Sequence, residues 1–132
     1  MFKEIKDKIY EKLSEINSIA EVKDYADIGK NYPMVVFEPY SWDNKTITQM
    51  QNERHYNFKL YIFQEYEKIG KKQAWEMLMQ VYDDILEKLN NNLLDGLCNN
   101  LEIQSSEFGT TQNTEDGKNV YSIIYISVKV LI

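Results

Sequence analysis

Two segments of the chain repeat apolar residues every three or four positions, which is the spacing of one face of an amphipathic helix. The first covers residues 2–17. The second begins at Gly70-Lys71-Lys72 and runs to Leu93, and Gly96 follows it where a left-handed C-terminal cap is expected. Charged residues occupy the opposite sides. We therefore expect two helices that cover a sheet through these apolar stripes: Phe2, Ile5, Ile9, Leu13 and Ile16, then Ala74, Trp75, Leu78, Val81, Tyr82, Ile85, Leu86, Leu89 and Leu93.

Five further segments have the patterns of strands. Residues 22–28 form a short and irregular one. Residues 33–37 form an apolar run bounded by Pro33 and Pro39, and residues 53–63 alternate between apolar and polar positions. The last two, 101–108 and 120–132, are expected to pair as a hairpin. Because the final segment is apolar on both faces, it predicts a strand in a central or interface-covered position.

Polar stretches separate these segments. Gly29-Lys30-Asn31 predicts a turn, whereas residues 40–52 and 109–119 predict two long loops. Loops of about twelve residues or more are often functional. Trp42, in the first loop, is a large aromatic residue outside every helix or strand pattern, and it is as well suited to an interface as to folding back onto the core.

The order of these elements predicts an α+β domain. The series is α-β-β-β-α-β-β, in which a mixed, largely antiparallel β-sheet is covered by two helices. The chain has 132 residues, a length that fits one domain spanning 1–132. Hydrophobic residues make up 43% of it, which is enough to bury a core.

Charge and composition exclude several classes of protein. The net charge is −6 and Arg54 is the sole arginine, so tight nucleic-acid binding is not expected. A single cysteine, Cys98, cannot form an internal disulfide. No uncharged stretch is long enough for a membrane-spanning helix, and the N-terminal residues are charged where a signal peptide would be apolar. We therefore expect an intracellular protein without membrane contact.

The residues capable of chemistry do not form a recognisable active site. Glu53 and His55 share one strand face, but no cysteine or second histidine completes a transition-metal set. Cys98 follows a helix end, where nothing would lower the pKa of its thiol. Gly70-Lys71 lacks the remainder of a phosphate-binding loop. Asp83-Asp84 are neighbours on a helix and point apart. No enzymatic activity, metal or cofactor is expected.

Aromatic residues at polar positions favour contact with other proteins. Tyrosine suits a surface that becomes buried on assembly, and several tyrosines occupy strand positions that should face water. The residues expected at an interface are Tyr40, Trp42, Met50, Tyr61, Tyr121 and Tyr125.

The arrangement resembles that of the tail terminator, or tail completion, proteins of long-tailed bacteriophages. The resemblance lies in an N-terminal helix, the strand Tyr32-Pro33-Met34-Val35-Val36-Phe37, the strand from Arg54 to Ile62, a long helix and a final pair of strands. It implies an α+β subunit of a ring, typically a hexamer, that caps the tail tube and joins it to the head. The implied partners are other copies of the chain, the tail tube protein and a head-connector protein. The implied location is the tail or neck of a virion, and the host cytoplasm during assembly.

Two other functions remain open from the sequence. A neck or head-completion connector would share the ring arrangement and differ in its partner. A small acidic inhibitor protein would also be acidic and have a single domain. It would concentrate its carboxylates on one face, however, whereas here lysine and glutamate are interspersed.

Overall fold

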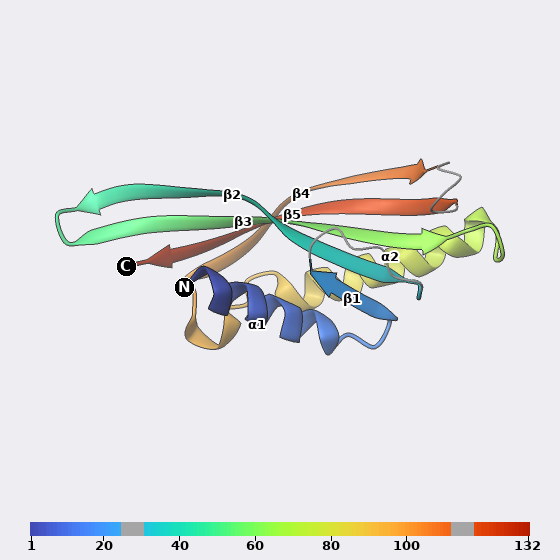
Figure 1. Cartoon of the computed structure of the whole chain (residues 1–132), viewed down its shortest axis with the longest axis horizontal. Helices are drawn as coiled ribbons and strands as arrows, with labels where there is room; N and C mark the ends of the chain where they lie inside the picture. The colour runs from blue at the N-terminus through green and yellow to red at the C-terminus, as the bar shows by residue number, and fades with distance from the viewer. Residues whose placement is uncertain (25–30, 112–117) are drawn as a thin grey trace.

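The strands of the structure form a single five-stranded sheet in the order β1-β2-β3-β5-β4 (Figure 1). The structure is a computed structural model that describes residues 1–24, 31–111 and 118–132. β1 runs parallel to β2, and the other neighbouring strands are antiparallel. The elements are α1 (Phe2–Ser14), β1 (Glu21–Asp24), β2 (Met34–Thr48), β3 (Gln51–Glu65), α2 (Lys71–Leu89), the short 3-10 helix η1 (Leu94–Gly96), β4 (Asn100–Thr111) and β5 (Asn119–Leu131).

This order confirms the α+β class and the predicted series of helices and strands. It also explains the composition of β5. Because β5 lies between β3 and β4, its backbone is paired on both sides, and a strand in the interior of a sheet can be apolar on both faces.

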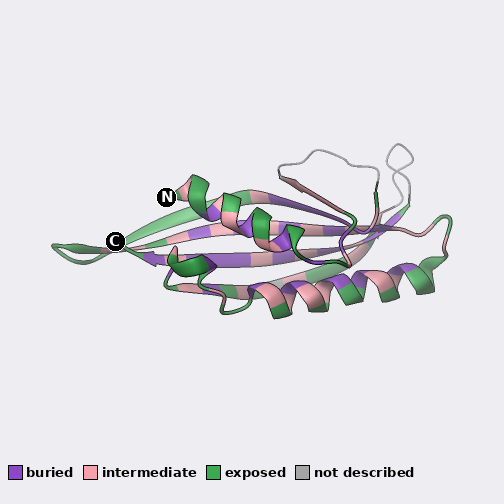
Figure 2. Cartoon of the chain, turned by 90° about the horizontal axis from the view of Figure 1, so that it is seen from below, coloured by how far each residue is buried: buried purple, intermediate pink, exposed green. Residues whose placement is uncertain are grey.

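Both helices lie on the same side of the sheet, and the core fills the space between them and the strands (Figures 1 and 2). The predicted alternation in β3 is confirmed, since its apolar positions are buried on the helix side while the residues between them are half-buried. The core side chains with no solvent exposure include Ile5, Ile9 and Leu13 of α1, Ala74, Leu78, Val81, Ile85 and Leu89 of α2, and Phe58, Leu60, Ile62, Leu101, Val120, Ile124 and Val128 of the sheet.

The prediction of a loop over residues 40–52 is wrong. β2 continues to Thr48 and β3 begins at Gln51, so the segment is the far part of a long β-hairpin. Every β2 residue from Pro39 to Thr48 is exposed, and this half of the strand is held by its backbone ladder to β3 rather than by a buried face. Pro39 does not end the strand, because the pairing of β2 with β1 stops at Phe37. Pro39 therefore lies on a free edge beside a β-bulge, where proline is tolerated.

Other element ends also differ from the predictions. β4 continues through Thr111, so Gly109 belongs to a strand and not to a loop. α1 ends at Ser14, three residues earlier than its pattern predicted. α2 ends at Leu89 with Asn90 in an extended conformation, and Gly96, at φ +92°, instead ends η1. Residues 29–30 of the predicted turn, residues 25–28 of the first predicted strand and residues 112–117 lie outside the described residues.

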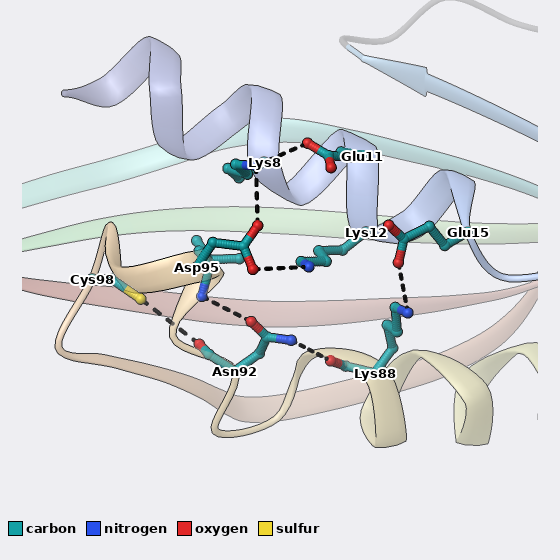
Figure 3. Close-up of polar contacts among 9 residues, drawn as sticks. Lys8, Glu11, Lys12, Glu15, Lys88, Asn92, Asp95 and Cys98 are labelled. Atoms are coloured by element: carbon teal, nitrogen blue, oxygen red, sulfur yellow. Dashed lines mark hydrogen bonds and ion pairs between the residues drawn. The ribbon is translucent and has the colours of Figure 1, made fainter.

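A polar network attaches α1 to the segment that follows α2 (Figure 3). Lys8 and Lys12 of α1 both reach the carboxylate of Asp95 in η1, with N–O distances of 3.0 and 3.2 Å. The pKa of Asp95 is lowered mainly by the hydrogen bond from Lys8 and next by the one from Lys12. The pKa of Lys8 is raised by the hydrogen bonds that it donates to Asp95 and Glu11. Glu15 pairs with Lys88 of α2 at 2.6 Å. These contacts fix the end of α1 over the C-terminal end of α2.

Truncation of the core face of α2 should destabilise the protein strongly. Ile85 has no solvent exposure, so Ile85→Ala should lower the free energy of unfolding by about 2–5 kcal/mol through lost burial and a residual cavity. Chemical denaturation followed by circular dichroism measures this change. Glu87→Ala, at an exposed position of the same helix, is the control and should change the unfolding free energy by less than about 0.5 kcal/mol. Equal stability of the two variants would contradict the packing of α2.

The Asp95 network should make a small, pH-dependent contribution to stability. A carboxylate whose pKa is lowered in the folded state stabilises that state at pH values above its pKa in the unfolded chain, which is 3.8 for Asp95. This stabilisation disappears as the pH falls through the lower pKa of the folded state. Asp95→Asn should therefore melt at a lower temperature than wild type at pH 7, and the difference should shrink below pH 3.8. Asparagine tolerates the positive φ of 58° found at this position.

The measurement is a series of thermal melts of wild type and Asp95→Asn from pH 7 to below pH 3.8. Asp83→Asn, at an exposed position of α2, is the matched control. A difference between Asp95→Asn and wild type that stays constant with pH would show that the charge of Asp95 is not what matters.

Candidate interaction surface

The side of the sheet opposite the helices is the surface that the described elements leave uncovered (Figure 1). We call it the open face. The bulged residue Tyr40 of β2 belongs to it, together with alternate residues of β3 and β5. These residues are Lys59, Tyr61, Phe63, Tyr121, Ile123 and Tyr125, and all six are half-buried. A contiguous aromatic surface of this kind on a sheet is typical of a site that another protein covers.

Lys59 lies between two tyrosines at the centre of the open face. Its ammonium group is 4.6 Å from the ring centroid of Tyr40 and 5.7 Å from that of Tyr125. The two rings are 5.8 Å apart in an edge-to-face arrangement. A cation over aromatic rings is attracted by their π-faces, so this arrangement gives the three long side chains a defined geometry.

The neighbouring aromatic side chains are also ordered. Tyr61 stacks on Phe63 with their ring centroids 6.0 Å apart, and its hydroxyl donates a hydrogen bond to Glu38 at 3.0 Å. Burial, followed by the negative charge and hydrogen bond of Glu38, raises the pKa of Tyr61. On β4, a Cβ atom at Gly109 would lie 2.5 Å from the Tyr121 hydroxyl oxygen, so the ring of Tyr121 occupies the space that a side chain at position 109 would need.

The second exposed feature is the distal hairpin, which we define as residues 39–57 of β2 and β3. It projects beyond both helices (Figures 1 and 2). Trp42 is 72% exposed and Met50, in the turn, is 92% exposed. Trp42 pairs with Tyr56 in the β2–β3 register, so it lies on the helix side of the sheet, 6.5 Å from the Tyr56 ring. A hollow beside it is lined by Phe2, Pro39, Tyr40 and Ser41.

The six residues predicted to form an interface therefore fall into three places. Tyr40, Tyr61, Tyr121 and Tyr125 lie together on the open face, Trp42 lies on the opposite side of the distal hairpin, and Met50 lies at its tip. Their role in contacts with another chain stays a prediction.

The sequence reasoning missed Lys59, Phe63 and Ile123 as members of this surface. The alternation of residues along each strand placed each of these three on the correct face of its own strand. It gave no information on the register that sets Lys59 opposite Tyr125 and Phe63 opposite Tyr121.

The Glu53–His55 pair is present but forms part of a structural cluster. His55 contacts Glu53 at 3.0 Å through Nε2 and Ser127 at 3.3 Å through Nδ1, and Lys129 lies 3.5 Å from Glu53. The hydrogen bond from His55 lowers the pKa of Glu53. Ser127 is 5% exposed on a strand paired on both sides, so its backbone offers no free donors for a developing oxyanion. The cluster joins β3 to β5.

The remaining candidates for chemistry are also built into the fold. Cys98 is buried, and burial raises the pKa of its thiol, which disfavours the reactive thiolate. Within residues 1–24, 31–111 and 118–132, no three His, Cys, Asp or Glu side chains come together in a way that could hold a metal ion. Neither α1 nor α2 is long and apolar enough to cross a membrane.

Comparison with known proteins shows a similarity in fold. No protein-family model matches the chain, and no curated protein matches it. Among the solved structures, 36 chains match. One of them is a chain of the virion of a native gene transfer agent particle, with a TM-score of 0.55 and 7% sequence identity over 92% of this chain and 90% of that chain. The chain therefore has, over nearly its whole length, a fold that is also found in a virion particle.

Proposed function

We propose that the chain is a structural protein of a phage-like virion, and that it acts as a tail terminator. In this role, copies of the chain form a ring, most simply of six, that caps the tail tube and joins it to the head. The observation that carries the proposal is the fold shared with a chain of the gene transfer agent virion along 92% of this chain. The series of elements that resembles tail terminators supports the finer assignment.

The described surface fits a role in assembly. Its distinctive features are an aromatic open face and a projecting hairpin, both suited to contacts with other subunits. The residues with catalytic potential hold strands together or are buried. The proposal therefore assigns the protein no enzymatic activity and no cofactor.

The charge of the chain fits a ring through which DNA passes. A net charge of −6 on each copy repels the phosphate backbone, so DNA would not be gripped on its way through the lumen. The proposed partners are other copies of the chain, the tail tube protein and a head-connector protein. The proposed location is the tail or neck of the virion, with assembly in the host cytoplasm.

Solution mass and partner capture together test this function. Light scattering should show a ring-sized oligomer at high protein concentration or after addition of the tail tube protein. The tube protein should also be captured by the tagged chain. A monomer in both conditions, without binding to tube or head protein, would refute the proposal and favour an acidic inhibitor. Capture of head protein without tube protein would favour a neck connector.

Trp42 should contribute to assembly and not to folding. Its side chain is 72% exposed, so Trp42→Ala should leave the unfolding transition nearly unchanged. If Trp42 is an anchor of the interface, the same change should weaken ring formation roughly tenfold or more. Met79→Ala, which removes a 40% exposed side chain from α2, is the matched control and should assemble normally. A large drop in melting temperature for Trp42→Ala would identify Trp42 as a core residue instead.

A further inference from the structure

Two strand edges of the sheet have long segments without a backbone partner in the described part of the chain. β1 pairs only with Met34–Phe37, which leaves the outer edge of β2 open along its exposed half. β4 is the last strand at the other side of the sheet. Within the described residues, its outer edge accepts a backbone hydrogen bond from the Asn91 N–H at the Leu101 carbonyl and is open from Ser106 to Thr111. An open edge presents a row of backbone N–H and C=O groups that another strand can pair with.

We propose that neighbouring copies in the ring join through these two edges, with Ser41–Thr46 of one copy forming an antiparallel ladder with Ser106–Thr111 of the next. This inference rests on the proposed function, because it states how the proposed ring is held together. The contact is head-to-tail, so each copy uses both of its open edges once.

The strand directions fit this pairing without inversion of either copy. β2, β3, β5 and β4 are each antiparallel to the next, so β2 and β4 of one copy run in opposite directions. A second copy placed alongside in the same orientation therefore brings an antiparallel pair of edges together. The helices of both copies then remain on the same side of the extended sheet.

The regular parts of the two edges are similar in length. β2 has irregularities between Pro39 and Ser41 and again between Thr46 and Thr48, which leaves six regular residues, Ser41–Thr46. β4 has a bulge between Ile103 and Ser105, and its ladder is regular beyond that point to Thr111. Bulges interrupt pairing, so they set the limits of the segment that each edge offers.

Registers of the two edges that differ by two residues all keep each side chain on its own face of the sheet. The charges of the facing side chains select one register among them. Lys45 lies opposite Glu53, and Glu107 lies opposite Ile123, so both project toward the open face. Pairing Ser41 with Thr111 sets Lys45 of one copy opposite Glu107 of the next. A slip of two residues in one direction would instead set Asp43 opposite Glu107, and like charges directly opposite are unfavourable.

The same register joins two exposed aromatic side chains on the helix side. Trp42 lies on that side of the distal hairpin, and Phe108 is 45% exposed beside Tyr82 and Trp75 of α2, with ring centroids at 5.3 and 6.4 Å. With Ser41 opposite Thr111, Trp42 is diagonal to Phe108, within reach of large aromatic side chains. The neighbouring copy thus provides a partner for the exposed ring of Trp42.

The pairing also requires the copies to be staggered. Within one copy, Ser41 lies opposite Asn57 of β3. Thr111 lies opposite Asn119 of β5, which in turn lies opposite Glu65 of β3, so the two edge positions are eight residues apart along β3. Adjacent copies are therefore displaced along the strands by about 26 Å, at about 3.3 Å per residue. Stagger of this kind tilts strands relative to the axis of a closed sheet.

Cysteine cross-linking tests the register directly. In Lys45→Cys/Glu107→Cys, oxidation or a short bismaleimide should link neighbouring copies into a ladder of multimers on a denaturing gel. The two positions of one copy are separated by β3 and β5, about 14 Å across the sheet, which is too far for a disulfide within a chain. Lys45→Cys/Glu102→Cys, with its second cysteine beyond the bulge of β4, is the matched control and should not cross-link.

A charge exchange gives an independent measurement. Glu107→Lys sets two lysines opposite one another and should reduce ring formation roughly fivefold. Adding Lys45→Glu restores opposite charges and should restore assembly. Failure of the double variant to recover would count against the proposed register.

The results separate this inference from the proposed function. Rings that form normally while Lys45→Cys/Glu107→Cys gives no cross-link would overturn the edge pairing and leave the virion role intact. Cross-linking of Lys45→Cys/Glu102→Cys instead would also overturn it. Absence of any oligomer with the tube protein present would refute both proposals.

Discussion

The pairing of β3 on both of its edges is the interaction on which the rest of the structure depends. This strand of fifteen residues forms ladders with β2 and β5 along nearly its full length. Its near half presents Phe58, Leu60 and Ile62 to the helices and so carries the core. Its far half continues past the helices and carries the distal hairpin (Figure 1). A single continuous ladder therefore connects the hydrophobic core to the most exposed part of the molecule.

The two halves of that ladder are stabilised differently. Over the core, burial of alternate apolar side chains adds to the backbone hydrogen bonds. In the distal hairpin, β2 is exposed from Pro39 to Thr48, and Tyr56 of β3 is the one buried side chain. The ladder there is otherwise supported by a few surface contacts, such as Arg54 with Asn44 and Asn57 with Ser41. A hairpin with so little burial is marginal by itself, so its conformation depends on the strands that continue into the core.

This difference explains which parts of the fold could be predicted from the sequence. Strand 53–63 and the face of α2 through Leu78 and Ile85 were predictable, because burial leaves a periodic apolar pattern. The far half of β2 was not, because a ladder of exposed polar residues leaves no such pattern.

The candidate surface was predictable to a similar extent. Alternation alone could place Tyr61 on the polar face of its strand, and Tyr121 and Tyr125 together on one face of theirs. The bulge at Tyr40, which puts Tyr40 on the open face and Trp42 on the other, has no signature in one sequence. The same holds for the register that brings Lys59 between Tyr40 and Tyr125.

The bulges of β2 and β4 have a consequence for the size of any assembly built through these edges. A repeated head-to-tail contact closes into a ring only if the rotation between successive copies divides a full turn evenly; otherwise it continues as an open helical filament. A β-bulge increases local strand twist, and β2 and β4 each carry one close to their open segments. The extra residue that each bulge already contains would therefore influence the curvature of the assembly. Through the curvature, it would also influence the number of subunits and the diameter of the passage that they enclose.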